Sequence, residues 1–147
     1  GWMNVFMGEY QHTLDSKGRI ILPARIREGL GDTFIATRGL DDCLFIYPMT
    51  EWGNLEGKLK QLSLVKPEAR AFSRYIFSGA AELEADKQGR VLLPPNLREY
   101  AKLEKDVVVI GVSTRIEIWN KEIWTQYNER MGPTVEQLSE HLIDFGI

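Results

Sequence analysis

The sequence is short of cysteine and of long apolar runs, and each shortage excludes a class of protein. Cys43 is the single cysteine among 147 residues, so an internal disulfide and a cysteine-rich zinc site are excluded, which fits a reducing compartment. No apolar run approaches the roughly 20 residues that cross a bilayer, and no charged start with an apolar centre indicates a signal peptide. We therefore expect a globular cytoplasmic protein without a membrane partner.

Excess positive charge is also missing. The net charge is −3 and the pI is about 5.5, whereas a protein that binds duplex DNA usually has a basic face. The charge is uneven, because residues 117–147 hold six acidic and two basic residues and the remainder carries a net +1. Within the remainder, one cluster of basic residues lies in the first repeat and another in the second: Lys17, Arg19, Arg25, Arg27 and Arg38, and Lys87, Arg90 and Arg98. The overall acidity therefore leaves room for a local surface that binds nucleic acid.

The sequence also lacks a recognisable set of catalytic residues. His12 lies near Asp15 in the sequence and could be a general base, but no serine or cysteine nucleophile accompanies it. The sequence also lacks metal-ligand spacing and a phosphate-binding loop. We expect neither an enzyme nor a cofactor or metal site, and we interpret His12 as a partly exposed strand residue.

The sequence does contain one fourteen-residue stretch twice. Residues 15–28 read DSKGRIILPARIRE, and residues 86–99, 71 positions later, read DKQGRVLLPPNLRE. Seven positions are identical, and three more exchange one aliphatic residue for another. The likeness extends upstream, where Phe6 and Gly8 match Phe77 and Gly79, and downstream into the region of the Trp52 and Trp124 positions. The chain therefore consists of two related halves.

Each copy of the motif predicts a local structure. Asp-x-x-Gly is typical of a tight turn in which the Asp carboxylate accepts backbone N–H groups and the Gly is left-handed, which predicts a hairpin between two strands. The turn residues are Asp15 and Gly18 in the first copy and Asp86 and Gly89 in the second. Arg followed by three aliphatic residues predicts a short buried strand, and the next residue, Pro23 or Pro94, begins a helix. The helices are expected over 24–30 and 95–101, which makes each half a strand, turn, strand and short helix.

The rest of each half adds a second hairpin and a longer helix. Apolar strands are expected at 33–37 with 44–47, and at 106–112 with 116–119. Pro48 begins a helix in the first half, and Asn120 caps the matching helix in the second. We expect one domain, residues 3–147, with repeat 1 over about 5–63, a linking helix over about 67–77, repeat 2 over about 76–131, and a C-terminal amphipathic helix over about 133–145 after Gly132-Pro133.

The doubled motif carries a family resemblance. With Asp15 to Arg19 led by Met-Gly-Glu-Tyr-Gln-His-Thr-Leu, and Asp86 to Arg90 led by Ile-Phe-Ser-Gly-Ala, the sequence resembles the MraZ family from Met3 to about Tyr127. More distantly, each half resembles the AbrB-type swapped-hairpin element. The resemblance implies an α+β fold in which two tandem AbrB-like strand-hairpin-helix halves form an intramolecular pseudo-dimer, a double-psi-type barrel with flanking helices.

The same resemblance implies that the protein is a sequence-specific DNA-binding transcriptional regulator associated with the nucleoid. The regulator is expected to repress the promoter of the division and cell-wall gene cluster that includes its own gene. The implied partners are double-stranded DNA with direct repeats in the promoter and further copies of the chain in a ring homo-oligomer, often an octamer. One alternative stays open: an oligomeric interaction or scaffold protein that does not read DNA.

The motif arginines carry the site prediction. Each Asp–Arg pair could simply fasten its turn, or the turn could hold Lys17 and Arg19 out on a rigid strand to bind phosphate or guanine O6 and N7. Arg27 and Arg98, near the helix C-termini, would be second-rank phosphate contacts. The predicted DNA-binding residues are Lys17, Arg19, Arg25, Arg27, Lys87, Arg90 and Arg98. Arg70 and Arg74, four residues apart on the linking helix, could bind phosphate or bridge to an acidic neighbour.

Overall fold

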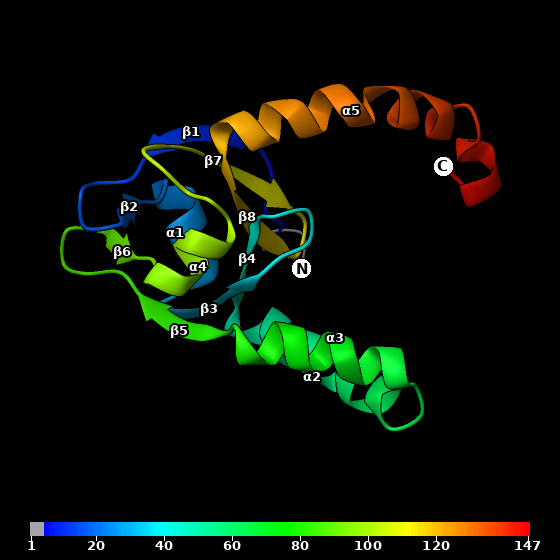
Figure 1. The fold of residues 1–147 in the computed structure, drawn as a ribbon, viewed down its shortest axis with the longest axis horizontal. Coiled ribbons are helices and arrows are strands. Elements are labelled where there is room, and N and C mark those ends of the chain that lie inside the picture. The colour runs from blue at the N-terminus through cyan, green and yellow to red at the C-terminus, as the bar shows by residue number, and fades with distance from the viewer. Residues whose placement is uncertain (1–4) are drawn as a thin grey trace.

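Helices and antiparallel strands alternate in the computed structural model, which describes residues 5–147 (Figure 1). Residues 3 and 4, where the expected domain begins, lie outside the described residues. The first half contains β1 (Glu9–Thr13), β2 (Arg19–Ile21), α1 (Ala24–Leu30), β3 (Thr33–Arg38), β4 (Leu44–Pro48) and α2 (Met49–Ser63). After α3 (Pro67–Ser78), the second half contains β5 (Ala81–Glu84), β6 (Arg90–Leu92), α4 (Pro95–Tyr100), β7 (Asp106–Val112), β8 (Arg115–Asn120) and α5 (Lys121–Ser139). The predicted α+β class is confirmed.

Each sheet contains strands of both halves. The larger sheet has the order β1-β7-β8-β4-β3-β5, so β1 of the first half pairs with β7 of the second, and β5 of the second half pairs with β3 of the first. The remaining strands, β2 and β6, form a two-stranded antiparallel ribbon. The halves are therefore interlocked, as the implied pseudo-dimer requires.

The hairpins expected across the two Asp-x-x-Gly turns are wrong in their strand pairing. Each turn is closed, because the Asp15 N–H donates to the Arg19 carbonyl (2.9 Å) and the Asp86 N–H donates to the Arg90 carbonyl (2.8 Å). Beyond the turn, and beyond one further bridge between Ala85 and Val91 in the second copy, the flanking strands separate, and each forms its ladder with the opposite half. The separation lets the aliphatic residues after each turn enter one core that both halves share. The other two expected hairpins, β3–β4 and β7–β8, are confirmed.

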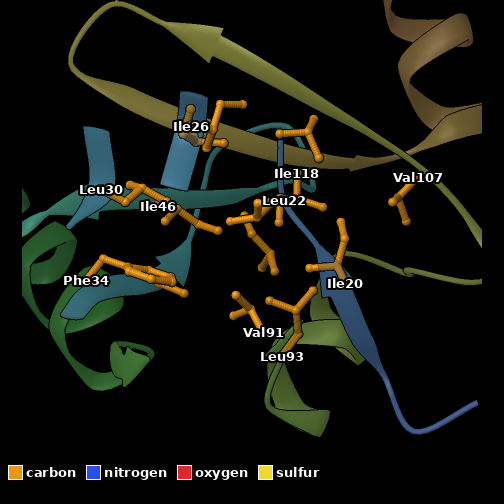
Figure 2. Close-up of a cluster of buried hydrophobic side chains, with 14 of the residues drawn as sticks. Ile20, Leu22, Ile26, Leu30, Phe34, Ile46, Val91, Leu93, Val107 and Ile118 are labelled. Carbon is orange, nitrogen blue, oxygen red and sulfur yellow. The ribbon is translucent and has the colours of Figure 1, made fainter. Parts of the chain in front are cut away.

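The shared core contains equivalent side chains from both halves. Ile20 and Leu22 are 1% exposed, and their counterparts Val91 and Leu93 are fully buried. Figure 2 shows them in one cluster with residues of α1 and of the larger sheet. Because alternate residues of a strand point to opposite faces, β2 and β6 bury Ile20 and Val91 and turn their other side chains outward.

Proline and asparagine begin the helices where the sequence predicts. Pro23 is the N-cap residue of α1, and α4, which follows Pro94, ends at Tyr100, one residue earlier than expected. Pro48 precedes α2, and the Asn120 side chain accepts a hydrogen bond of 3.0 Å from the Ile123 N–H at the start of α5. Helices α2 and α3 pack together and extend away from the sheets (Figure 1).

The predicted break at Gly132-Pro133 is wrong, because α5 continues through Pro133 to Ser139 and a short 3₁₀ helix follows over Leu142–Phe145. Proline removes one backbone donor within a helix, and an exposed helix can leave the freed carbonyl to water. Helix α5 has no buried residue, and three apolar residues of the expected C-terminal amphipathic helix, Val135, Leu138 and Phe145, are 63%, 51% and 64% exposed. Across residues 5–147, no helix has the length and apolar character needed to cross a membrane.

Candidate nucleic-acid interface

The two motif turns lie at one end of the molecule, beside the β2–β6 ribbon and opposite the ends of the α2–α3 pair and of α5 (Figure 1). In the ribbon, Arg19 pairs with Leu92, Ile20 with Val91, and Ile21 with Arg90. The middle pair points into the core. The ribbon therefore has an approximate twofold arrangement that places one arginine and one aliphatic residue from each half on its outer face.

Each turn has the hydrogen bonds that the sequence predicts. Asp15 Oδ1 accepts the N–H groups of Lys17 and Arg19, both at 2.9 Å. The Gly18 N–H donates to the Asp15 carbonyl at 3.0 Å, and the φ of +82° at Gly18 lies in the region that favours glycine. The second turn repeats this arrangement, with Asp86 accepting from Gln88 and Arg90 at 2.9 Å. The predicted tight turns are confirmed.

These hydrogen bonds keep the two carboxylates charged. The backbone N–H of Arg19 lowers the pKa of Asp15 to about 2, with further contributions from the Arg19 side chain and the Lys17 N–H. The backbone N–H of Arg90 lowers the pKa of Asp86 in the same way. Both turns therefore carry an ionised aspartate at neutral pH.

The aspartates also orient the motif arginines. Arg19 Nε lies 2.7 Å from Asp15 Oδ2, and Arg90 Nε lies 2.7 Å from Asp86 Oδ2. The ion pairs of the fastening interpretation are thus present. They use Nε only, and within the described residues neither guanidinium makes a further hydrogen bond. The remaining N–H groups of each arginine are the ones that form bidentate contacts with phosphate or guanine.

The other predicted contact residues divide between the turns and the helices. Lys17 and Lys87 are exposed in the turns, and Arg25 is exposed on α1. Arg70 and Arg74 lie on α3, in the projecting α2–α3 pair, and Arg70 Nη1 donates to the Ser63 carbonyl at 3.2 Å. Lys17 and Lys87 therefore lie in the turns beside the ribbon and Arg25 lies on α1, whereas Arg70 and Arg74 lie on α3, in the helix pair that extends away from the ribbon (Figure 1).

Arg27 and Arg98 each lie against the turn of the other half. Arg98 Nε donates to the Leu93 carbonyl at 2.9 Å, and a Cβ added at Gly18 would collide with the Arg98 guanidinium. A Cβ added at Gly89 would lie 2.8 Å from Arg27 Nη1. Sequence reasoning missed this relationship. The repeat showed that both glycines and both arginines recur, but a repeat does not indicate which arginine faces which turn.

Sequence reasoning also assigned Ile21 and Leu92 to buried strands, which is wrong. Each is 53% exposed, on the same face of the ribbon as Arg19 and Arg90. The alternation of a strand was the available signal, since burying Ile20 and Leu22 forces Ile21 outward. Aliphatic side chains beside arginines on a β-ribbon are suited to contacts with thymine methyl groups in a major groove.

Comparison with known proteins identifies the family. The family model described as "MraZ protein, putative antitoxin-like" matches the chain twice, over residues 5–75 and 76–145. The transcriptional regulator MraZ of Desulforamulus reducens is 62% identical over 140 residues, which cover 95% of this chain and 99% of that protein. The transcriptional regulators MraZ of Natranaerobius thermophilus and Heliobacterium modesticaldum are 59% and 58% identical over 143 residues, which cover 97% of this chain and all of each relative.

Proposed function

The chain belongs to the MraZ family of transcriptional regulators, and on that premise we propose that it binds specific DNA sequences and represses the promoter of the division and cell-wall gene cluster that includes its own gene. It is a regulator of transcription and not an enzyme. Its partner is double-stranded DNA that carries direct repeats, and it acts on the nucleoid in the cytoplasm.

The observation that carries this proposal is the arginine pair on the β2–β6 ribbon. A major groove admits a two-stranded β-ribbon, and an arginine with free N–H groups can bind guanine O6 and N7. Arg19 and Arg90 have their Nε atoms held at 2.7 Å by Asp15 and Asp86, which restricts each guanidinium before DNA arrives. Such pre-organisation reduces the entropy that binding costs.

The surrounding basic residues supply contacts to the DNA backbone. Lys17 and Lys87 extend from the turns, and Arg25 is exposed on α1. The first half is the more basic, because the positions equivalent to Lys17 and Arg25 are Gln88 and Asn96. Contact by the first half therefore contributes more to affinity. The sequence predicts that Arg27 and Arg98 are second-rank phosphate contacts, but their packing against the turns of the opposite halves favours a different role.

The acidic residues are compatible with this surface because of where they lie. Residues 117–147 carry a net charge of −4 whereas the rest of the chain carries +1, and α5 extends away from the ribbon (Figure 1). Beyond about 10 Å, exposed charges are largely screened at ordinary ionic strength. The acidity of α5 therefore opposes DNA binding at the other end of the molecule only weakly.

We infer a ring homo-oligomer as the binding form. The family resemblance implies a ring, and the exposed apolar residues of the C-terminal segment, Val135, Leu138, Ile143 and Phe145, are of the kind that subunit contacts cover. A ring that presents several ribbons to direct repeats converts weak individual contacts into one strong site, because later contacts are intramolecular.

A second candidate function is an oligomeric scaffold that does not read DNA, and the net charge of −3 favours it. Footprinting on the DNA upstream of the chain's own gene, with a gel shift at several salt concentrations, separates the two. The regulator protects direct repeats and loses affinity as salt rises. A folded oligomer that protects no DNA even at low salt would contradict the regulator and support the scaffold.

A further inference from the structure

Arg98, a residue of the second half, contacts the first motif turn both directly and through Leu93. Arg98 Nε donates to the Leu93 carbonyl at 2.9 Å, and the Leu93 N–H donates to the Gly18 carbonyl at 3.1 Å. The guanidinium itself occupies the space where a side chain at Gly18 would lie. The turn that presents Arg19 is therefore supported by a helix residue of the second half.

The second turn has the reciprocal support. Arg27 Nε donates to the Leu22 carbonyl at 3.2 Å, and its guanidinium lies against Gly89, where an added Cβ would be 2.8 Å from Nη1. Gly18 and Gly89 are both buried, although each lies in a turn with exposed neighbours. The packing of an arginine on the glycine of the opposite turn therefore occurs twice in one chain.

From these contacts we propose that Arg27 and Arg98 are positioning residues, each of which holds the DNA-contacting turn of the opposite half in its binding geometry. The role of the turns in this statement rests on the proposed function, whereas the support itself does not. Arginine suits the task because its planar guanidinium can lie flat on a glycine while Nε binds a carbonyl. Lysine has neither the plane nor the Nε donor.

The proposal implies that a substitution in one half loosens the turn of the other half. Removing the Arg98 guanidinium should loosen the turn of residues 15–19 and leave the turn of residues 86–90 in place. Removing the Arg27 guanidinium should do the opposite. General destabilisation of the fold would loosen both turns together, so it would not loosen only the turn of the half opposite to the substitution.

Hydrogen exchange measured by mass spectrometry on the full chain without DNA tests the proposal. The variants are Arg98→Met and Arg27→Met, which keep a long apolar side chain, with Arg25→Met as the control on the exposed side of α1. We expect Arg98→Met to speed exchange several-fold in peptides that contain the Lys17 and Arg19 amides, and Arg27→Met to do so for Gln88 and Arg90. Unchanged exchange, or faster exchange only in a variant's own half, would overturn the proposal.

A milder variant keeps the test valid if the methionine variants do not fold. Arg98→Lys retains the positive charge and the aliphatic stem, and Arg27→Lys does the same in the first half. The proposal expects each lysine variant to fold and still to show faster exchange in the opposite turn. Full protection of that turn by lysine would contradict a role for the guanidinium.

DNA binding of the same variants separates positioning from direct contact. A lost phosphate contact reduces the magnitude of the slope of log K against log salt by about 0.9 and leaves hydrogen exchange in the first turn normal, whereas a mispositioned turn speeds that exchange and lowers specific affinity more than non-specific affinity. We expect the second result for Arg98→Met. A reduced slope with normal exchange in the first turn would make Arg98 a phosphate contact and overturn the positioning role. If the parent chain does not bind DNA, the proposed function fails, but the exchange result still decides whether the arginines support the turns.

Discussion

The guanidinium of Arg98 packs against Gly18, a residue of the other half of the chain, and the Arg98 Nε donates to the Leu93 carbonyl at 2.9 Å. Because Arg27 and Gly89 repeat this relationship, each motif turn depends on both halves. The Asp-x-x-x-Arg motif is therefore more than a local ion pair. Its aspartate, glycine and arginine have separate tasks, which can be tested separately.

Arg19→Ala should weaken specific DNA binding strongly while leaving the fold intact. A bidentate arginine contact to guanine contributes about 1–3 kcal/mol of discrimination, so specific affinity should fall roughly 5- to 150-fold for each such contact. Circular dichroism and a gel shift on the same sample measure both properties. Arg74→Ala, on the distant helix α3, is the matched control. Unchanged affinity of a folded Arg19→Ala variant would exclude direct contact.

Asp15→Ala and Asp86→Ala should lower the melting temperature. Each aspartate accepts two backbone N–H groups at 2.9 Å and orients its arginine, so the variants lose the bonds that close the turns. A decrease of a few degrees is expected by differential scanning calorimetry. Variants that melt like the parent but no longer bind DNA would assign the carboxylates a direct role in binding.

Acid should weaken the turns over a defined range of pH. The pKa of Asp15 is about 2 in the folded chain against an ordinary 3.8, so folding favours the ionised form. The resulting stabilisation is fully present above about pH 4 and is lost as the pH falls through about 2. Thermal unfolding between pH 5 and pH 2 measures it. The melting temperature of the double variant Asp15→Asn, Asp86→Asn should depend less steeply on pH in this range. A pH dependence identical to that of the parent chain would contradict the stabilising role of the two ionised aspartates.

Neighbouring isoleucines of β2 should respond in opposite ways. Ile20→Ala should cost about 2–5 kcal/mol of stability, because Ile20 is 1% exposed in the shared core. Ile21→Ser should change stability by only about 0.5 kcal/mol, because Ile21 is 53% exposed, but it should weaken specific DNA binding. Chemical denaturation and a gel shift distinguish the two. Full DNA affinity of Ile21→Ser would exclude apolar contact by the ribbon.

The exposed C-terminal segment should join subunits. Light scattering should give a mass several times the 16.9 kDa of one chain, and Leu138→Asp should reduce that mass without unfolding the sheets. DNA with three repeats should bind far more tightly than DNA with one, because the ring shares binding energy among its subunits. A monomeric mass at micromolar concentration, or equal affinity for both DNAs at fixed salt, would contradict the ring.

The sequence by itself determined the features that depend on neighbouring residues. The turn hydrogen bonds of Asp15, the left-handed Gly18 and the helix that follows Pro23 were all predictable, because each involves residues within about four positions of one another. The repeat also indicated two equivalent halves. The family resemblance supplied their interlocked arrangement and the choice of Lys17 and Arg19 as DNA-binding candidates.

Only the tertiary structure decided which half each element contacts. The strands beside each turn pair across the halves because Ile20 and Val91 must enter a single shared core, and that requirement lies outside either repeat. The same packing exposes Ile21 and brings Arg98 to Gly18. Local pattern can predict a turn, but it cannot identify a partner 80 positions away, since the partner is selected by how two distant segments fill the same space.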